Sequence, residues 1–141
     1  MAESLDERIE NAFGSVTDPM PAVAERAEQL LDSDRAIVWE GDASTFEFAF
    51  VSESAADVLG YPAERWLEPG FWADVVVHPE DRDYAVSYCA LATGQGRDHE
   101  FEYRAVAADG RVVRLRDVVK VVLNERGRPE RLRGIMIPLD G

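Results

Sequence analysis

The sequence predicts an α+β fold in which helices cover one antiparallel sheet. Three consecutive strands joined by tight turns are expected between residues 98 and 139, and a second strand pattern covers residues 36–52. Helical patterns occupy the residues before these strands and those between them. With 141 residues, the chain fits one domain that can bury its own core.

The first strand of the carboxy-terminal meander is expected at residues 99–105. It alternates charged residues with Phe101, Tyr103 and Ala105, which is typical of a strand buried on one face. Asp109-Gly110 then supplies a dipeptide that accepts the backbone of a two-residue hairpin turn. A strand, a turn and a second strand are therefore expected in succession.

The next strand, residues 112–123, is rich in valine at both parities. Both of its faces must therefore be covered, one by inner helices and the other by a further element. A turn at residues 124–127 leads into the last strand, residues 128–139. Gly134 lies inside this strand and predicts that a side chain there would obstruct a close neighbour.

Two helices are expected at the amino terminus. Ser4 and Glu7 form a capping box for the first, which ends at Gly14, and Asp18-Pro19 begins the second. We predict a helical segment over residues 1–34 that covers the sheet or forms a dimer contact. Residues 35–141 form the main domain.

The first two strands are expected at residues 36–40 and 45–52. Phe46, Phe48 and Phe50 alternate with other residues in the second of them, so they are expected to form a core wall on one face.

Three helical stretches should follow. Ser52 or Ser54 is expected to cap a short helix that runs through Leu59, and an irregular stretch covers residues 62–77. A longer helix is expected from His78-Pro79 to about Thr93, with carboxylates in its first turn.

The composition excludes several classes of protein. Lys and Arg number 15 against 28 Asp and Glu, so the formal charge of -13 argues against direct nucleic-acid binding. A single lysine beside this acidic excess is typical of a protein that works in concentrated salt, although a GC-rich genome explains the arginine bias equally well.

No apolar run is long enough to cross a membrane and the start resembles no signal peptide. The single cysteine, Cys89, fits a reducing interior, so a cytoplasmic location is expected.

Seven short blocks, in this order and at this spacing, resemble the signatures of PAS domains and of their carboxy-terminal PAC segment. They start at Trp39, Phe50, Leu59, His78, Glu100, Asp109 and Leu132, and read WEGD, FVS, LGYP, HPEDR, EFEYR, DGR and LRG. The resemblance covers roughly residues 35–139. It implies a five-stranded antiparallel sheet with short helices and one longer helix on its concave face, to which the amino-terminal helices are added.

The resemblance also implies a role. PAS domains are sensory or dimerisation modules, not enzymes, within sensor kinases, transducers and related signalling proteins. The chain ends in Pro-Leu-Asp-Gly where family members often continue with Asp-Ile-Thr into a connector helix. An effector is expected outside this sequence.

The sequence does not identify a cofactor, but it disfavours two that PAS domains bind, haem and covalent flavin. Haem would need a histidine on the long helix, which has none after its first residue, His78. Covalent flavin chemistry would need a cysteine before that helix, whereas Cys89 lies within it. Cys89 is interpreted as a buried packing residue, with a redox sensor as the alternative. His78, His99 and Cys89 are dispersed, so no metal site is expected.

A small apolar or aromatic ligand between the long helix and the sheet is the remaining expectation. Its candidate wall residues are Trp39, Phe48, Phe50, Val58, Trp66, Phe71, Tyr88, Cys89, Phe101, Tyr103, Leu115 and Met136. The alternative is that these side chains fill the space and that the domain only forms homodimers or binds partners. Tyr84, Tyr88 and Tyr103 are too few polar groups for an enzyme site.

Overall fold

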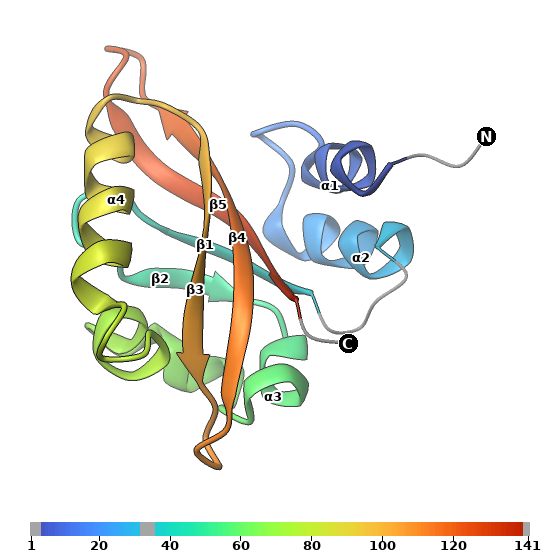
Figure 1. Ribbon diagram of the computed structural model, residues 1–141. Helices are drawn as coiled ribbons and strands as arrows, with labels where there is room; N and C mark the ends of the chain where they lie inside the picture. Colours follow the sequence, from blue (N-terminus) through green and yellow to red (C-terminus); the bar gives the residue numbers. More distant parts are fainter. Residues whose placement is uncertain (1–3, 32–35, 140–141) are drawn as a thin grey trace.

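The computed structural model describes residues 4–31 and 36–139, and its centre is a five-stranded antiparallel sheet (Figure 1). The strands are β1 (Ile37–Asp42), β2 (Phe48–Val51), β3 (His99–Val106), β4 (Val112–Leu123) and β5 (Pro129–Pro138). Their order across the sheet is β2-β1-β5-β4-β3. The carboxy-terminal meander is confirmed, and β5 lies beside β1, so the first and the last strand are neighbours in the middle of the sheet.

Four helices cover the inner face of the sheet. They are α3 (Ser54–Leu59), the 3₁₀ helix η1 (Ala63–Leu67), the single π turn η2 (Trp72–Val76) and α4 (Arg82–Gly94). Their apolar side chains form one core cluster with the sheet, in which Trp66 and Leu115 are fully buried. The predicted fold, α+β with a five-stranded antiparallel sheet, is confirmed.

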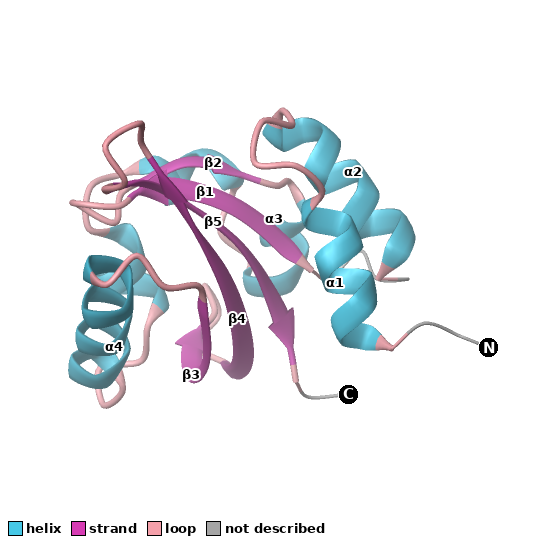
Figure 2. Cartoon of the chain, turned by 90° about the horizontal axis from the view of Figure 1, so that it is seen from above, coloured by secondary structure: helices cyan, strands magenta, loops and turns pink. Residues whose placement is uncertain are grey.

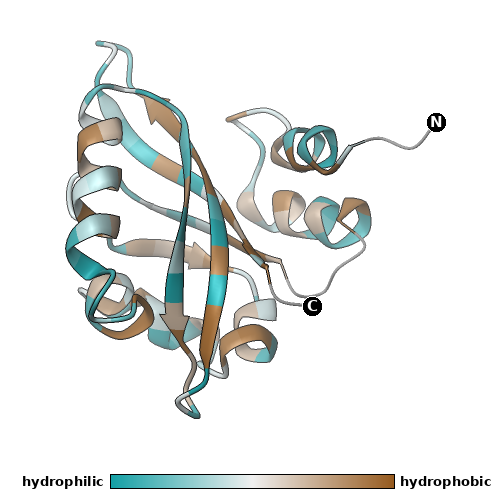
Figure 3. Ribbon diagram, viewed as in Figure 1, coloured by the Kyte–Doolittle hydropathy of each residue, from teal (hydrophilic) through white to brown (hydrophobic). Residues whose placement is uncertain are grey.

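Helices α1 (Leu5–Phe13) and α2 (Met20–Leu30) lie on the outer face, opposite α4 (Figure 2). The predicted cap of α1 is confirmed, because Ser4 Oγ accepts a hydrogen bond from the Glu7 amide at 3.1 Å. The two helices bury an apolar cluster against the sheet that includes Val23, Val118 and Ile135. Stretches of β4 and β5 between the two helical layers are hydrophobic (Figure 3). A sheet buried on both faces explains why β4 carries valine at both parities.

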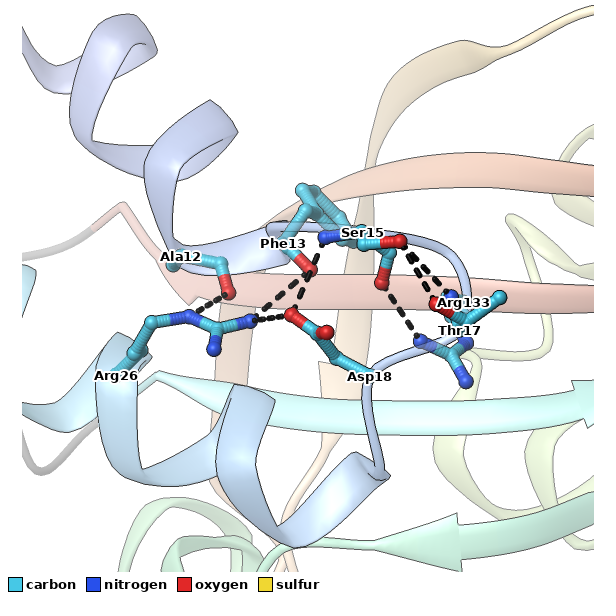
Figure 4. A network of polar contacts seen from close by, with 7 residues as sticks. All are labelled: Ala12, Phe13, Ser15, Thr17, Asp18, Arg26 and Arg133. Carbon is cyan, nitrogen blue, oxygen red and sulfur yellow. Dashed lines mark hydrogen bonds and ion pairs between the residues drawn. The ribbon is translucent and has the colours of Figure 1, made fainter.

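Arg26 of α2 closes the carboxyl end of α1 (Figure 4). Its Nε donates to the Ala12 carbonyl at 3.2 Å and its Nη2 to the Phe13 carbonyl at 3.3 Å. The same Nη2 pairs with Asp18 at 2.8 Å. Because carbonyls at a helix end lack partners within the helix, one side chain here joins both helices into a hairpin.

A second arginine attaches this hairpin to the sheet. Arg133 of β5 is buried, donates through Nη1 to the Ser15 carbonyl at 3.4 Å and pairs through Nε with Glu40 of β1 at 3.0 Å (Figure 4 shows the Ser15 contact). Glu40 and Arg133 are direct neighbours across β1 and β5. The connection between α1 and α2 is therefore bonded to the central strands.

The predicted wall of three phenylalanines is wrong. The register of β1 with β2 shifts between Glu40 and Gly41, so the strict alternation is interrupted. Phe48 packs into the inner core, whereas Phe50 packs with the outer cluster against the hairpin. Phe46 precedes the strand with a positive φ of 61° and packs against the inner core.

The long helix also begins later than expected, at Arg82, because residues 78–81 form a turn. His78 Nδ1 accepts a hydrogen bond from the Glu80 amide at 3.1 Å, and the His78 amide donates to the Arg104 carbonyl at 2.9 Å. His78 is thus a structural turn residue that holds the start of α4 against β3.

Asp81→Asn is expected to lower the free energy of unfolding by about 1–3 kcal/mol, since it removes charge-assisted hydrogen bonds. The Asp81 carboxylate accepts hydrogen bonds from the Arg104 amide at 2.8 Å and from its guanidinium at 2.7 Å and 3.1 Å. These bonds hold the pKa of Asp81 down to about 2. Urea unfolding of the variant measures the loss.

Glu80→Gln is the matched control for Asp81→Asn. Glu80 pairs with the same guanidinium at 3.3 Å, but its side chain is 69% exposed, so its loss should change stability by less than about 0.5 kcal/mol. Equal losses in the two variants would contradict the assignment of the interaction to Asp81. The stabilisation by Asp81 is present above its ordinary pKa and is lost as the pH falls toward about 2.

Candidate functional site

A cavity of about 20 Å³ lies between the inner face of the sheet and its helices. This volume is just above what one water molecule requires. Five aromatic rings and four other side chains line it: Trp39, Phe46, Phe48, Trp72, Cys89, Phe101, Asp117, Val119 and Leu132. The wall is therefore apolar except for one carboxyl group.

That carboxyl group, Asp117, lies near the centre of the sheet. It belongs to β4, opposite Phe101 of β3 and Met136 of β5, and is only 1% exposed. Asp117 Oδ1 accepts a hydrogen bond from Trp39 Nε1 at 3.0 Å, and Oδ2 accepts one from the Tyr103 hydroxyl at 2.8 Å. A buried acid is costly without such bonds, so both partners contribute to its placement.

The network continues to the inner helices. Trp72 Nε1 of η2 donates to the Tyr103 hydroxyl at 3.0 Å, and that hydroxyl donates in turn to Asp117. The Trp72 and Tyr103 rings pack edge to face with their centroids 5.8 Å apart. A chain of hydrogen bonds thus connects a helix on the inner face to the middle of the sheet.

Gly134 allows Trp39 to reach Asp117. The indole extends from β1 over β5, where Gly134 is the residue directly opposite Trp39, toward β4. A Cβ atom at Gly134 would overlap the indole ring. The expectation that a side chain here would obstruct a close neighbour is confirmed, and the neighbour is the donor to the buried acid.

Burial dominates the electrostatics of the site. It raises the pKa of Asp117 to about 7, although the hydrogen bonds from Tyr103 and Trp39 oppose the rise. Burial also raises the pKa of Tyr103 well above its ordinary value, with the Asp117 charge adding to the effect. The pKa of Cys89 is raised to about 12 by burial and by Asp117. Asp117 is therefore the group of this cavity that can change charge near neutral pH.

The structure brings eleven of the twelve predicted wall residues into the inner core or against it. Trp39, Phe48, Cys89 and Phe101 line the cavity itself. The others lie elsewhere in the same core: Val58, Trp66, Phe71, Tyr88, Tyr103, Leu115 and Met136. Phe50 lies on the outer face and has no part in this site.

Five lining residues were absent from the predicted set: Phe46, Trp72, Asp117, Val119 and Leu132. A signal for Asp117 exists in the sequence. Along β4 the inward positions are Val113, Leu115, Asp117 and Val119, so Asp117 is an acid on the buried parity of an apolar strand. Such a residue predicts a buried polar network.

The other polar groups of the described chain give weaker indications of a functional site. His99 is a strand residue whose Nδ1 lies 2.9 Å from the Arg97 carbonyl, and burial lowers its pKa. Within residues 4–31 and 36–139, no three histidine, cysteine or acidic side chains are grouped as a metal would require. In the same part of the chain, no helix has the length and apolar character needed to cross a membrane.

The comparisons with known proteins agree on one fold family. A family model described as the PAS fold matches residues 48–136. The amino-terminal domain of a diguanylate cyclase with a PAS/PAC sensor from Marinobacter aquaeolei is 36% identical, with a TM-score of 0.69 over 74% of this chain and 94% of that one. No curated protein matches.

Two more distant structures share the fold. A sensory box histidine kinase/response regulator from Burkholderia thailandensis is 18% identical, with a TM-score of 0.62 over 81% of this chain and 84% of that one. The PAS domain of the fruit-fly ELK potassium channel is 12% identical, with a TM-score of 0.67 over 89% of this chain and all of that one, 100%.

Proposed function

Because this chain belongs to the PAS-fold family, we propose that it is the sensory module of a signalling protein and responds to a small ligand at the Asp117 cavity. The observation that supports this most is a connected polar network beside a cavity in an otherwise apolar core. An apolar cavity with a few polar groups that converge on it is a common form of ligand site. The module itself would not be catalytic, and its effector would lie outside this sequence.

The proposed relay runs through β1 and β5. On the inner side, Trp39 contacts the network and crosses β5 at Gly134. Glu40 follows Trp39 in β1, and Arg133 precedes Gly134 in β5. On the outer side, Arg133 donates a hydrogen bond to Glu40 and another to the Ser15 carbonyl of the helical hairpin. A ligand that moves the Trp39 indole would thereby bias the seating of α1 and α2. These helices would also form the contact between two copies of the chain in a cytoplasmic homodimer.

A second candidate is a ligand-free module that only dimerises or binds a partner. The cavity volume of about 20 Å³ favours it, because an apolar or aromatic ligand could enter only if side chains moved. The two candidates differ in what the purified protein contains.

The experiment is an absorption spectrum of the purified protein, followed by mass spectrometry of the small molecules released on denaturation. A stoichiometric small molecule is expected. Val119→Leu, which adds one methylene group at the cavity wall, should reduce the bound fraction, whereas Val112→Leu at an exposed position of the same strand should not. An empty protein that sedimentation shows to be dimeric would contradict the ligand proposal and support the second candidate.

A further inference from the structure

We propose that the Asp117 cavity binds the ammonium group of a small protonated amine. This inference rests on the proposed function, since it assumes that a ligand occupies the cavity, and it narrows the ligand to a cation. Three features carry it: the missing partner of Asp117, the direction of its hydrogen bonds, and the aromatic wall.

Asp117 has no cationic partner among the residues that the structure describes. It is 1% exposed, yet it takes part in none of the ion pairs formed within residues 4–31 and 36–139. The nearby basic residues of the central strands turn to the outer face, where Arg133 pairs with Glu40 and Arg116 with Glu100. Buried charges in proteins are normally paired, so the site lacks one positive charge.

The hydrogen bonds all point toward the carboxylate. The Trp39 and Trp72 indoles can only donate, and the Tyr103 hydroxyl passes the Trp72 bond on to Asp117. Both carboxyl oxygens can accept these bonds in either protonation state, but the bonds are stronger to the ionised carboxylate. An ionised carboxylate accepts about four hydrogen bonds, and the residues that the structure describes supply two. The remaining capacity is available to an N–H donor in the adjoining cavity.

The wall of the cavity suits a cation. Trp39 and Phe48 pack edge to face with centroids 5.4 Å apart, and Trp72 and Phe101 do so at 6.3 Å, so rings of different orientation surround the space. Aromatic faces attract ammonium groups, most strongly where water is excluded. A volume of about 20 Å³ admits a group the size of water, which an ammonium head resembles. Phe46 is half-buried, whereas the other lining residues are buried, so it marks the side on which an alkyl substituent would lie.

Methylammonium chloride is the probe, with methanol as its neutral counterpart and sodium chloride as the salt control. The indole N–H resonances of Trp39 and Trp72 in ¹⁵N-labelled protein report on the site. We expect a saturable shift with methylammonium that neither control produces. Asp117→Asn should weaken methylammonium binding about tenfold or more, because a charge-assisted bond becomes a neutral one. Equal binding by methanol, or undiminished binding by Asp117→Asn, would overturn the inference.

A second measurement needs only the unaltered protein. Methylammonium stays protonated between pH 8 and pH 5, whereas Asp117, whose pKa is about 7, gains a proton over this range. Tyr103 and Cys89, the other titratable groups packed around Asp117, have raised pKa values and stay protonated throughout. His99, two residues before Phe101 on β3, has a lowered pKa, so its own charge appears only toward the acidic end. Affinity should therefore fall several-fold toward pH 5, and an affinity independent of pH would overturn the inference.

The two proposals fail separately. If the protein carries a stoichiometric neutral molecule, or binds methanol as well as methylammonium, the cation inference is wrong while the sensory function stands. If the purified protein is empty and dimeric but methylammonium binds as described, the sensory proposal fails while the assignment of the cavity as a cation site stands.

Discussion

Gly134→Ala is expected to lower the melting temperature by about 10 °C, because its Cβ atom would occupy the position of the Trp39 indole. The indole would have to leave a buried site and give up its bond to Asp117. Overpacking costs about 1–3 kcal/mol, and a lost bond to a charged group adds about 1.5–3 kcal/mol. For a chain of this length, each kcal/mol corresponds to roughly 3 °C. Thermal unfolding followed by circular dichroism measures the change.

Gly94→Ala is the matched control for Gly134→Ala. Gly94 is the last residue of α4, and a Cβ atom there meets nothing within 4 Å. Its replacement should be neutral or stabilise by up to about 1 kcal/mol through helix propensity. In the Gly134→Ala background, Trp39→Phe should recover part of the loss because the smaller ring leaves room for the methyl group. A Gly134→Ala variant as stable as the Gly94→Ala variant would show that the close approach costs nothing.

Between pH 4 and pH 8, the free energy of unfolding of the unaltered protein is expected to contain a contribution from Asp117 that decreases as the pH rises. The Asp117→Asn variant should lack this decrease. The folded-state pKa of Asp117 is raised from 3.8 to about 7, so the folded protein binds this proton more tightly than the unfolded chain does. The resulting stability is fully present below pH 4 and is lost as the pH rises through 7. Since a tenfold change in proton affinity is 1.36 kcal/mol, the loss is on the order of 4 kcal/mol.

The difference between the two proteins isolates this effect. Asp81, Asp18 and Asp42 have lowered pKa values, so each loses its stabilising effect on acidification, the opposite trend. These contributions are common to the protein and its Asp117→Asn variant, and they cancel when the free energies of urea unfolding are subtracted at each pH. A difference that stays constant from pH 4 to pH 8 would refute the assignment of a near-neutral pKa to Asp117.

The strand meander and the capped helices could be predicted because each depends on short-range rules. Alternation in residues 99–105 and the Asp109-Gly110 turn need no knowledge of distant residues. The same holds for the cap at Ser4. The fold family followed from several such blocks in a fixed order, and the match over residues 48–136 agrees.

The parts that were missed depend on pairings between distant strands. Phe50 faces outward because the register of β1 with β2 shifts between Glu40 and Gly41. No residue pattern within positions 45–52 indicates that shift. Asp117 and Trp39 are 78 positions apart, and their contact exists only because Gly134 lies between them in the sheet. The alternation of residues along β4 could have identified Asp117 as an acid on the inner face. Because valines occur on both faces of β4, the sequence alone did not show which face is the inner one.

The position of the tryptophans makes the two faces of the sheet distinguishable by spectroscopy. The chain has three tryptophans, Trp39, Trp66 and Trp72, and all three are buried in the inner core, two of them hydrogen-bonded within the Asp117 network. Helices α1 and α2 contain none. Intrinsic fluorescence therefore reports on the inner core, while release of the outer hairpin would lower helical ellipticity and leave the emission nearly unchanged. A separation of the two signals during unfolding would measure how tightly one face of the sheet is coupled to the other.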